Sequence, residues 1–316
     1  MSDAAPPPGS QPDLTAEDFA ALFDSLAGWR QGQQVEEPGR LARRRPADVL
    51  AAFGAVRLGE SVSLALPIDR EAGPDNPHPA LHHMVDQGDV EAAEPSAHKD
   101  FLGLDYHGKA VTHLDALCHI GYRGELFGGV AAGKAISSLG SEWGAVTTLA
   151  SGIFVRAVLY DVARARGVNW LEPGTAVHAG DLRAVEQTQG VQAGPGDALL
   201  LRTGHQARRT ALGPWDSGLA SAGLHVDSMT LLAEREVAVL GSDGDNDVRP
   251  SPVAGVHSPI HALALTALGI VLLDNLDLEA LSEACATHGK HDFLLAVAPL
   301  VVPRGTGSPV NPVAVL

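Results

Sequence analysis

The stretch from residue 105 to residue 119 gathers side chains that bind metal ions. Three histidines and one aspartate fall within thirteen positions: His107, His113, Asp115 and His119. Imidazole and carboxylate groups together suit zinc, manganese or iron better than calcium. In an extended segment, His113 and Asp115 face the same side and could share one ion. His119 is in phase with them if the strand continues, or it can reach the ion through a turn.

The same residues could also have no role in metal binding. Histidines near a carboxylate are often surface groups or hydrogen-bonded core residues. Three ligands at this spacing, set among apolar residues, favour a metal site instead. A bound divalent ion lowers the pKa of water and polarises a carbonyl group, while a nearby histidine can accept a proton and return it. The pattern therefore predicts metal-assisted hydrolysis, and hydrolysis of an amide, a cyclic imide or a lactone would fit equally.

A family resemblance begins at these residues. The segment Thr112-His-Leu-Asp-Ala-Leu-Cys-His119 resembles the T-H-x-D-x-x-x-H signature of the cyclase family of metal-dependent hydrolases, which includes bacterial kynurenine formamidase and isatin hydrolase. Val237–Asp243 is similar to a later strand and loop of that family. Gly305–Pro312 resembles the C-terminal segment of its longer members. The resemblance covers roughly residues 61 to 316.

The resemblance implies roles for individual residues. The implied metal ligands are His113, Asp115, His119, His261 and Asp274. His119 matches a histidine that binds a second metal ion or transfers protons, and His261 is the distant histidine of the site, so both are also candidate catalytic residues. The spacing from His261 to Asp274 differs by about one residue from the formamidase pattern, which makes His257 the substitute candidate.

One position departs from the family. Lys109 stands four residues before His113, where the family usually has another histidine. A protonated lysine cannot coordinate a metal ion. Three interpretations stay open: His107 moves into the site, the site holds one ion with fewer protein ligands, or Lys109 acts as a catalytic residue that stabilises an oxyanion. The departure argues against a dinuclear zinc site.

We therefore expect an enzyme that uses zinc or manganese to hydrolyse an amide, cyclic imide or lactone bond of a small molecule. The first alternative is a metal-dependent cyclase or lyase that acts on a hydroxylated substrate, as the family name suggests. The second is a homologue that binds a metal ion or a small molecule without catalysis, for which Lys109 is the motivating feature.

Composition narrows the classes of partner. The chain has 316 residues and a formal net charge of −16, and it lacks the long Lys/Arg cluster that a nucleic acid or an anionic membrane would need. Two cysteines without a C-x-x-C pattern form no disulfide framework. No signal peptide or membrane-spanning run is visible in the sequence. We expect a cytoplasmic protein that forms a homo-oligomer, either a dimer or a tetramer.

Apolar runs of strand length and amphipathic stretches alternate along the chain. Strands are expected at residues 61–66, 153–160, 198–201, 237–240, 270–273 and 293–302. Helices are expected at residues 182–189 (with Asp181 as N-cap), 229–236, 261–268 and 276–287. Continuous Val/Leu/Ile runs are typical of strands buried on both faces. The pattern predicts a single α/β domain with a mixed sheet, and the resemblance implies the swivelling β/β/α fold.

Three parts are expected along the chain. Residues 1–13 are predicted to be a disordered tail because proline and small residues dominate them. Residues 14–60 are predicted to be a helical extension, which opens with a capping box of Thr15 and Asp18 and has a first helix ending near Gly28. Residues 61–316 form the predicted hydrolase domain.

Two further segments are expected near the site. Residues 69–100 are polar and contain four histidines, so they are predicted to form a long loop or excursion, and long loops often cover a site. Asp243–Asp247 lacks the spacing of an EF-hand and is predicted to be a loop beside the site. Arg202 and His205 follow a predicted strand and are weaker candidates for substrate contacts.

Overall fold

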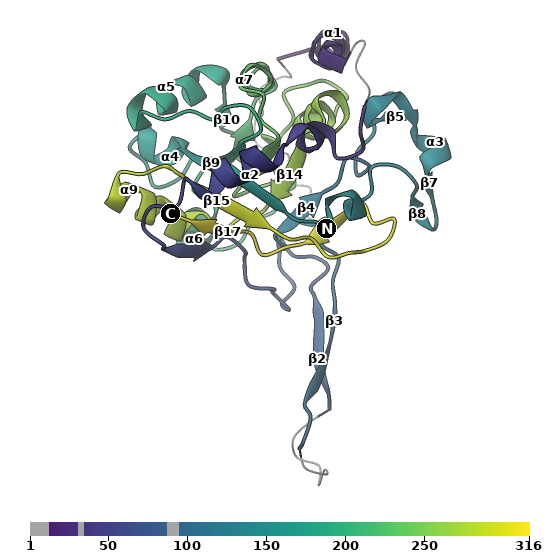
Figure 1. Cartoon of the computed structure of the whole chain (residues 1–316), viewed down its shortest axis with the longest axis vertical. Coiled ribbons are helices and arrows are strands. Elements are labelled where there is room, and N and C mark those ends of the chain that lie inside the picture. Colours follow the sequence, from purple (N-terminus) through teal and green to yellow (C-terminus); the bar gives the residue numbers. More distant parts are fainter. Residues whose placement is uncertain (1–12, 31–34, 87–94) are drawn as a thin grey trace, which may run out of the picture.

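The structure is a computed structural model that describes residues 13–30, 35–86 and 95–316. A nine-stranded mixed sheet crosses its body (Figure 1). In spatial order, the strands of this sheet are β1 (Ser61–Ser63), β17 (Val313–Val315), β15 (Asp292–Val297), β9 (Ile153–Asp161), β11 (Ala198–Arg202), β13 (Val239–Ser242), β14 (Val271–Asp274), β4 (His113–Asp115) and β16 (Gly307–Pro309).

The middle of this sheet is parallel. β9, β11, β13 and β14 run in the same direction. All five residues of β11 are buried, as are all four of β13 and of β14, which explains why their sequences are continuous apolar runs. β15 and β17 continue the sheet antiparallel on one side, and β4 and β16 do so on the other. The predicted α/β domain with a mixed sheet is confirmed.

Four two-stranded pairs lie outside this sheet. They are β2 (Leu81–Asp86) with β3 (Lys99–Gly103), β5 (Glu125–Leu126) with β6 (Val130–Ala131), β7 (Ile136–Ser137) with β8 (Gly140–Ser141), and β10 (Ala176–Val177) with β12 (Gly223–Leu224). The β10–β12 pair is parallel and the others are antiparallel.

Helices pack against the sheet and against one another. The α-helices are α1 (Ala16–Ala27), α2 (Pro46–Phe53), α3 (Ala132–Ala135), α4 (Val162–Ala165), α5 (Ala179–Gln189), α6 (His205–Leu212), α7 (Ser228–Glu234), α8 (Pro259–His261) and α9 (Glu279–His288). The 3₁₀ turns are η1 (Gly28–Arg30), η2 (Gly39–Arg43), η3 (Phe127–Gly129) and η4 (Val146–Leu149), and η5 (Ala262–Leu268) is a π-helix. α5 contacts α4, α7 and β9, whereas α1 and α7 contact η5. Within the described residues, no helix is long and apolar enough to span a bilayer.

The N-terminal segment joins the same core as the sheet. The capping box at Thr15 and Asp18 is present, and Gly28 follows the last residue of α1. Phe19 is fully buried and meets the ring of Tyr122 edge-on, with centroids 5.3 Å apart. The predicted tail falls outside the described residues except for Asp13, so it stays a prediction, as do the boundaries at residues 14, 60 and 61.

Residues 69–100 were expected to be a long loop or excursion. The excursion is present, but part of it is a paired hairpin and not a loop. Leu81–Asp86 and Lys99–Gly103 pair as an antiparallel hairpin, which projects far from the body of the molecule (Figure 1). No side chain of either strand is fully buried. The sequence therefore lacks the alternation that a half-buried strand shows, which is why this pair was missed.

Other predicted boundaries moved. The strand expected at 61–66 ends at Ser63, and the one expected at 293–302 ends at Val297, two residues before Pro299, which has no backbone N–H to donate. The stretch expected as an ordinary helix at 261–268 is mostly the π-helix, and the helix expected at 276–287 begins at Glu279. Asp181 is not the N-cap of α5. His178 is the N-cap, and its N–H donates to Asp181 Oδ2 at 2.8 Å.

Candidate metal centre

Strand pairing places three predicted ligands on one face of the sheet. β4 pairs antiparallel with β14, so His113 lies opposite Asp274. Residues opposite each other, and residues two apart along a strand, face the same side. His113, Asp115 and Asp274 therefore share one face, while Leu114 points into the core and is fully buried.

His261 joins this group from another element. It is the last residue of α8. Its Nε2 atom lies 3.2 Å from Asp274 Oδ2 and 3.6 Å from Asp115 Oδ2. His113 Nε2 lies 3.5 Å from Asp115 Oδ1 and 4.0 Å from Asp274 Oδ2. Two ligand atoms that each bind one ion at about 2.1 Å are roughly 3–3.5 Å apart, so these four side chains have the spacing of a shared metal site.

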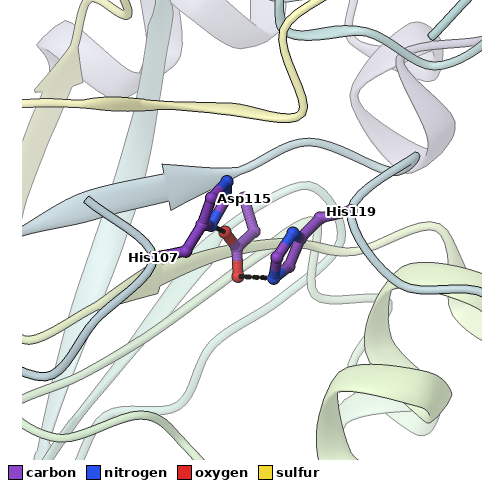
Figure 2. A group of neighbouring side chains, drawn as sticks. All are labelled: His107, Asp115 and His119. Atoms are coloured by element: carbon purple, nitrogen blue, oxygen red, sulfur yellow. Dashed lines mark ion pairs between the residues drawn. The ribbon is translucent and has the colours of Figure 1, made fainter. Parts of the chain in front are cut away.

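Two further histidines approach Asp115, as Figure 2 shows. His107 Nδ1 lies 2.9 Å from Asp115 Oδ1, and His119 Nε2 lies 3.9 Å from Asp115 Oδ2. Their rings stack with centroids 3.9 Å apart and an interplanar angle of 2°. β4 ends at Asp115, and a turn closed by the bond from His119 N–H to the Ala116 carbonyl (2.9 Å) brings His119 back. Asp115 is thus shared by two groups of ligand atoms.

Outer hydrogen bonds set the tautomers of two of these histidines. His113 Nδ1 donates to the Val111 carbonyl at 2.9 Å, and His261 Nδ1 donates to Asp247 Oδ2 at 2.6 Å. The other nitrogen of each ring, Nε2, faces Asp115. Burial lowers the pKa of His261, but the carboxylates of Asp274, Asp115 and Asp247 outweigh burial and raise it well above its ordinary value, so a metal ion would displace a proton from this ring. A carboxylate or carbonyl behind the ring is typical of metal-binding histidines.

The carboxylate of Asp115 tests whether a metal ion fits here. Asp115 is 1% exposed, and neither of its oxygens has a hydrogen-bond partner among the described residues. A buried polar atom left without a partner is costly. Burial alone would raise the pKa of Asp115, but the surrounding imidazoles, His113 first, hold it well below the ordinary value. A buried anion ringed by imidazole nitrogens fits a divalent cation.

The loop between β13 and α8 supports these ligands. Asn246 Nδ2 donates to Asp274 Oδ1 at 2.6 Å. Asp247 accepts the bond from His261 and also the Ile260 N–H at 2.8 Å, so one carboxylate orients the ring and the start of α8. The loop expected near the site is therefore in contact with it, and Asp245, Asn246 and Asp247 are all buried. The sequence indicated these supporting residues only through the run of acidic residues that directly follows a buried strand.

Lys109 lies beside the centre and not within it. Its ammonium group pairs with Asp245, which also accepts a bond from Arg249 Nε at 2.9 Å. His107, and not Lys109, contacts Asp115. Of the three interpretations open for Lys109, this geometry favours the one in which His107 enters the site.

Two other candidates have different neighbours. The ring of His257 lies against Arg249, with Nη1 of Arg249 3.2 Å from Nδ1, whereas His261 is the histidine that reaches Asp115. Arg202 forms ion pairs with Asp161 at 2.9 Å and Glu279 at 2.7 Å, so its guanidinium group is held by the protein's own carboxylates.

A cavity of about 750 Å³ lies next to Lys109. Lys109, His205 and Arg209 contribute to its wall, along with residues at the base of the β2–β3 hairpin such as His82. None of the five side chains around Asp115 lines it, whereas Lys109, which pairs with Asp245 beside the ligands, does. The cavity is large enough for a small molecule.

The imidazole of His119 has a strongly lowered pKa. Burial lowers the pKa of His119 to about 4, with the negative charge of Asp115 opposing this shift and the nearby histidines adding to it. Its ring is neutral at pH 7. A neutral imidazole that keeps 23% of its side chain exposed can accept a proton from a molecule entering the site.

Known structures share this architecture. A crystal structure of a novel cyclase is 28% identical, with a TM-score of 0.82 over 93% of this chain and 99% of that one. An isatin hydrolase bound to the product analogue thioisatinate is 21% identical, with a TM-score of 0.58 over 85% and 95% of the two chains. A potential metal-dependent hydrolase with cyclase activity is 14% identical, with a TM-score of 0.50 over 81% and 98%.

Sequence comparison gives the family. Among curated proteins, none matched this chain. The Cyclase family model matches residues 62–246, more than half of the chain. That range contains the T-H-x-D-x-x-x-H segment, β9, β11 and β13. The fold that the resemblance implied is thus supported by both comparisons, and the chain belongs to the Cyclase family.

Proposed function

We propose that this protein is a metal-dependent hydrolase that cleaves an amide, cyclic imide or lactone bond of a small molecule. The buried carboxylate of Asp115 carries this proposal, because the surrounding imidazoles keep it ionised and the Nε2 atoms of His113 and His261, two rings held from behind by outer acceptors, both face it. Zinc or manganese would suit this mixture of imidazole and carboxylate ligands.

Each side chain has a proposed role. His113, Asp115, His261 and Asp274 would hold the ion, with His107 and His119 beside Asp115 as further ligands if a second ion binds. When bound, a divalent ion supplies a Lewis acid that polarises a carbonyl and lowers the pKa of water. His119 is proposed to take the proton from water and pass it to the leaving group. It can do so because it is neutral at pH 7 and partly exposed.

Lys109 is proposed to orient the substrate. It borders the cavity and pairs with Asp245 in the loop that supports the ligands. Its ammonium is held by Asp245, so it presents a positive charge with a defined position. A carbonyl or carboxylate oxygen of a substrate would be attracted to this charge. The bound product analogue in the isatin hydrolase relative makes isatin a sensible first probe.

The test of the centre is its metal content. Elemental analysis of the wild-type protein, after stripping and reconstitution with zinc or manganese, should give near-stoichiometric ion. His113→Ala and Asp115→Asn should lose at least one equivalent. His288→Ala is the matched control, because His288 is an exposed histidine far from the centre whose ring lies 3.0 Å from the carboxylate of Glu60. Absence of bound metal in the reconstituted wild type would refute the hydrolase mechanism.

The test of the reaction is turnover of isatin, formamides, cyclic imides and lactones. Hydrolysis should place one atom of solvent ¹⁸O in the product, whereas a cyclase or lyase reaction would not. Turnover without solvent oxygen would replace the proposed hydrolase with that alternative. A fully metallated protein that turns over no member of the panel would favour a binding protein.

A further inference from the structure

A second group of metal-ligating side chains lies at the start of two helices, apart from the centre at Asp115. It consists of His178, the N-cap of α5, His225, which follows β12, and Asp227, the N-cap of α7. One nitrogen of each histidine and one oxygen of Asp227 lie within 4.8 Å of one another. Nothing in the proposed hydrolysis uses this group.

The spacing inside the group matches ligands that share an ion. His178 Nδ1 lies 3.0 Å from Asp227 Oδ2, and His225 Nδ1 lies 3.2 Å from Asp227 Oδ1. The centroids of the two imidazole rings are 4.4 Å apart. Ligand atoms bound to one ion at about 2.1 Å are roughly 3–3.5 Å apart, so the carboxylate has a ring nitrogen at that separation on each oxygen.

The backbone around the group is held by hydrogen bonds. His225 N–H and Ser228 Oγ both donate to the Val177 carbonyl, at 2.9 and 2.7 Å. Ala179 N–H donates to Asp227 Oδ1 at 3.3 Å. These bonds tie the first residues of α5 to the segment that carries His225 and Asp227, so the three side chains are positioned before any ion binds.

The hydrogen bonds of His225 indicate which of its ring nitrogens carries the proton. Asp227 N–H donates to His225 Nδ1 at 3.3 Å, which makes Nδ1 the nitrogen with the lone pair in a neutral ring. Nε2 then carries the proton. This atom is buried and has no hydrogen bond among the described residues, and the side chain as a whole is 8% exposed. Asp13 Oδ2, at 3.8 Å, is the acidic oxygen that it faces.

Two ring nitrogens face the two oxygens of Asp227 at close range. His178 Nδ1 donates a hydrogen bond to Asp227 Oδ2 at 3.0 Å, and His225 Nδ1 lies 3.2 Å from Asp227 Oδ1. A divalent cation bound between them would replace the ring proton that His178 shares with the carboxylate. A buried imidazole that ligates through one nitrogen and points the other at a carboxylate also matches the arrangement in which an outer carboxylate supports a metal-binding histidine.

We propose that His178, His225 and Asp227 form a second binding site for a divalent transition-metal ion of the zinc class, with Asp13 as an outer support. Two imidazoles and one carboxylate suit such an ion, and the exposed sides of His178 and Asp227 leave room for water as a fourth ligand. The site links the starts of α5 and α7 to the N-terminal segment. Its role is structural, because an ion that binds only the folded chain stabilises that chain.

The experiment counts zinc ions in the full-length protein. Wild type, His178→Gln and His288→Gln are stripped with a chelator and titrated with Zn²⁺ alone by calorimetry and elemental analysis. His178→Gln is chosen because its side chain is 47% exposed, so the substitution leaves the core intact. His288 is the matched control, since it also is an exposed histidine 3.0 Å from a carboxylate.

His178→Gln should bind one zinc ion fewer than wild type, or bind that ion at least about 100-fold more weakly, and His288→Gln should match wild type. In an Asp115→Asn background, Zn²⁺ should still raise the unfolding temperature, and adding His178→Gln should abolish this rise. Equal zinc stoichiometry and affinity in wild type and His178→Gln would overturn the proposal. Because the comparison is a difference between two proteins, it holds whatever number of ions the centre at Asp115 takes.

Discussion

The tripeptide pattern His-x-Asp occurs in both groups of candidate metal ligands, and the fold gives the two copies different surroundings. His113-Leu-Asp115 forms β4, where both polar side chains face one side of the sheet. His225-Val-Asp227 lies at a turn between β12 and α7. Asp115 is 1% exposed and has no hydrogen bond among the described residues, whereas the Asp227 side chain is 47% exposed and already accepts a backbone N–H.

The difference shows that burial and neighbours, more than the tripeptide, set the chemistry. Asp115 is approached by four histidines, and solvent cannot screen its charge. Asp227 is approached by two, and water competes for it. Electrostatic attraction is stronger where water is excluded. The first region is therefore suited to catalysis and tight binding, and the second to a weaker structural ion.

The largest expected effect separates the two aspartates. Asp115→Asn should lower kcat/KM by about 10³-fold or more, because the buried ligand charge is removed. Asp227→Asn should leave kcat/KM within about threefold, since surface substitutions away from a site are nearly neutral. Steady-state kinetics on the best substrate of the panel would check both. Equal losses in the two variants would remove the distinction between the regions.

A second test separates proton transfer from metal binding within the first region. His119→Gln should lower kcat by about 10²–10⁴-fold, the usual contribution of a general base, while the ion held by His113, Asp115, His261 and Asp274 is retained. His178→Gln should leave kcat unchanged. If His119→Gln loses that ion, then His119 is one of its ligands and not the proton carrier.

A third test compares the outer carboxylates. Asp247 is not a proposed ligand, but its Oδ2 atom accepts the hydrogen bond from His261 Nδ1 at 2.6 Å. Asp247→Asn should therefore weaken metal binding at the first region by about 10–100-fold. Asp13 is 3.8 Å from His225 and 61% exposed, so Asp13→Asn should change zinc affinity at the second region by less than about threefold. Calorimetric titration of both variants measures this ratio, and a reversed order would show that burial does not set the strength of the support.

The smallest effect concerns a buried histidine outside both regions. Burial lowers the pKa of His205 to about 4, against the charges of Asp245 and Asp75. The unfolded chain, with a pKa near 6.5, takes up the proton first as the pH falls. The stability from this neutral histidine is thus present above about pH 6.5 and is lost between about pH 6.5 and 4.

This loss should amount to about 2 kcal/mol between pH 7.5 and pH 5. Urea unfolding of the metal-free protein at both pH values checks it, and His205→Gln should show a correspondingly smaller drop. An identical drop in wild type and His205→Gln would mean that His205 does not remain neutral in the folded protein.

Much of the fold could be predicted because its central strands are continuous apolar runs, as in Ala198–Arg202. The β2–β3 hairpin could not, since both of its faces meet solvent and leave no periodic pattern. The spacing of His113 and Asp115 predicted a shared face, which the register of β4 explains. Their partners were harder to find: Asp274 and His261 came from family resemblance, and Asp247 was visible only as an acidic loop.

The second region was missed for a related reason. His225 and Asp227 are two positions apart in the sequence, but His178 lies 49 positions before Asp227 and meets it because β10 pairs with β12. Contacts made by short, two-residue strands leave little trace in a sequence. Spacing alone therefore reveals ligands on one element and not those that tertiary packing adds.

The sequence distance spanned by the centre at Asp115 has a consequence for refolding. The His107 ring meets Thr306, 199 residues later, and Thr112 bonds to Asn275, 163 residues later. Contacts between such distant segments require the closure of long loops and tend to form slowly. The affinity for metal should therefore appear only when β4 has been enclosed by both β14 and β16, so that the kinetics of ion uptake during refolding report the last tertiary step of the chain.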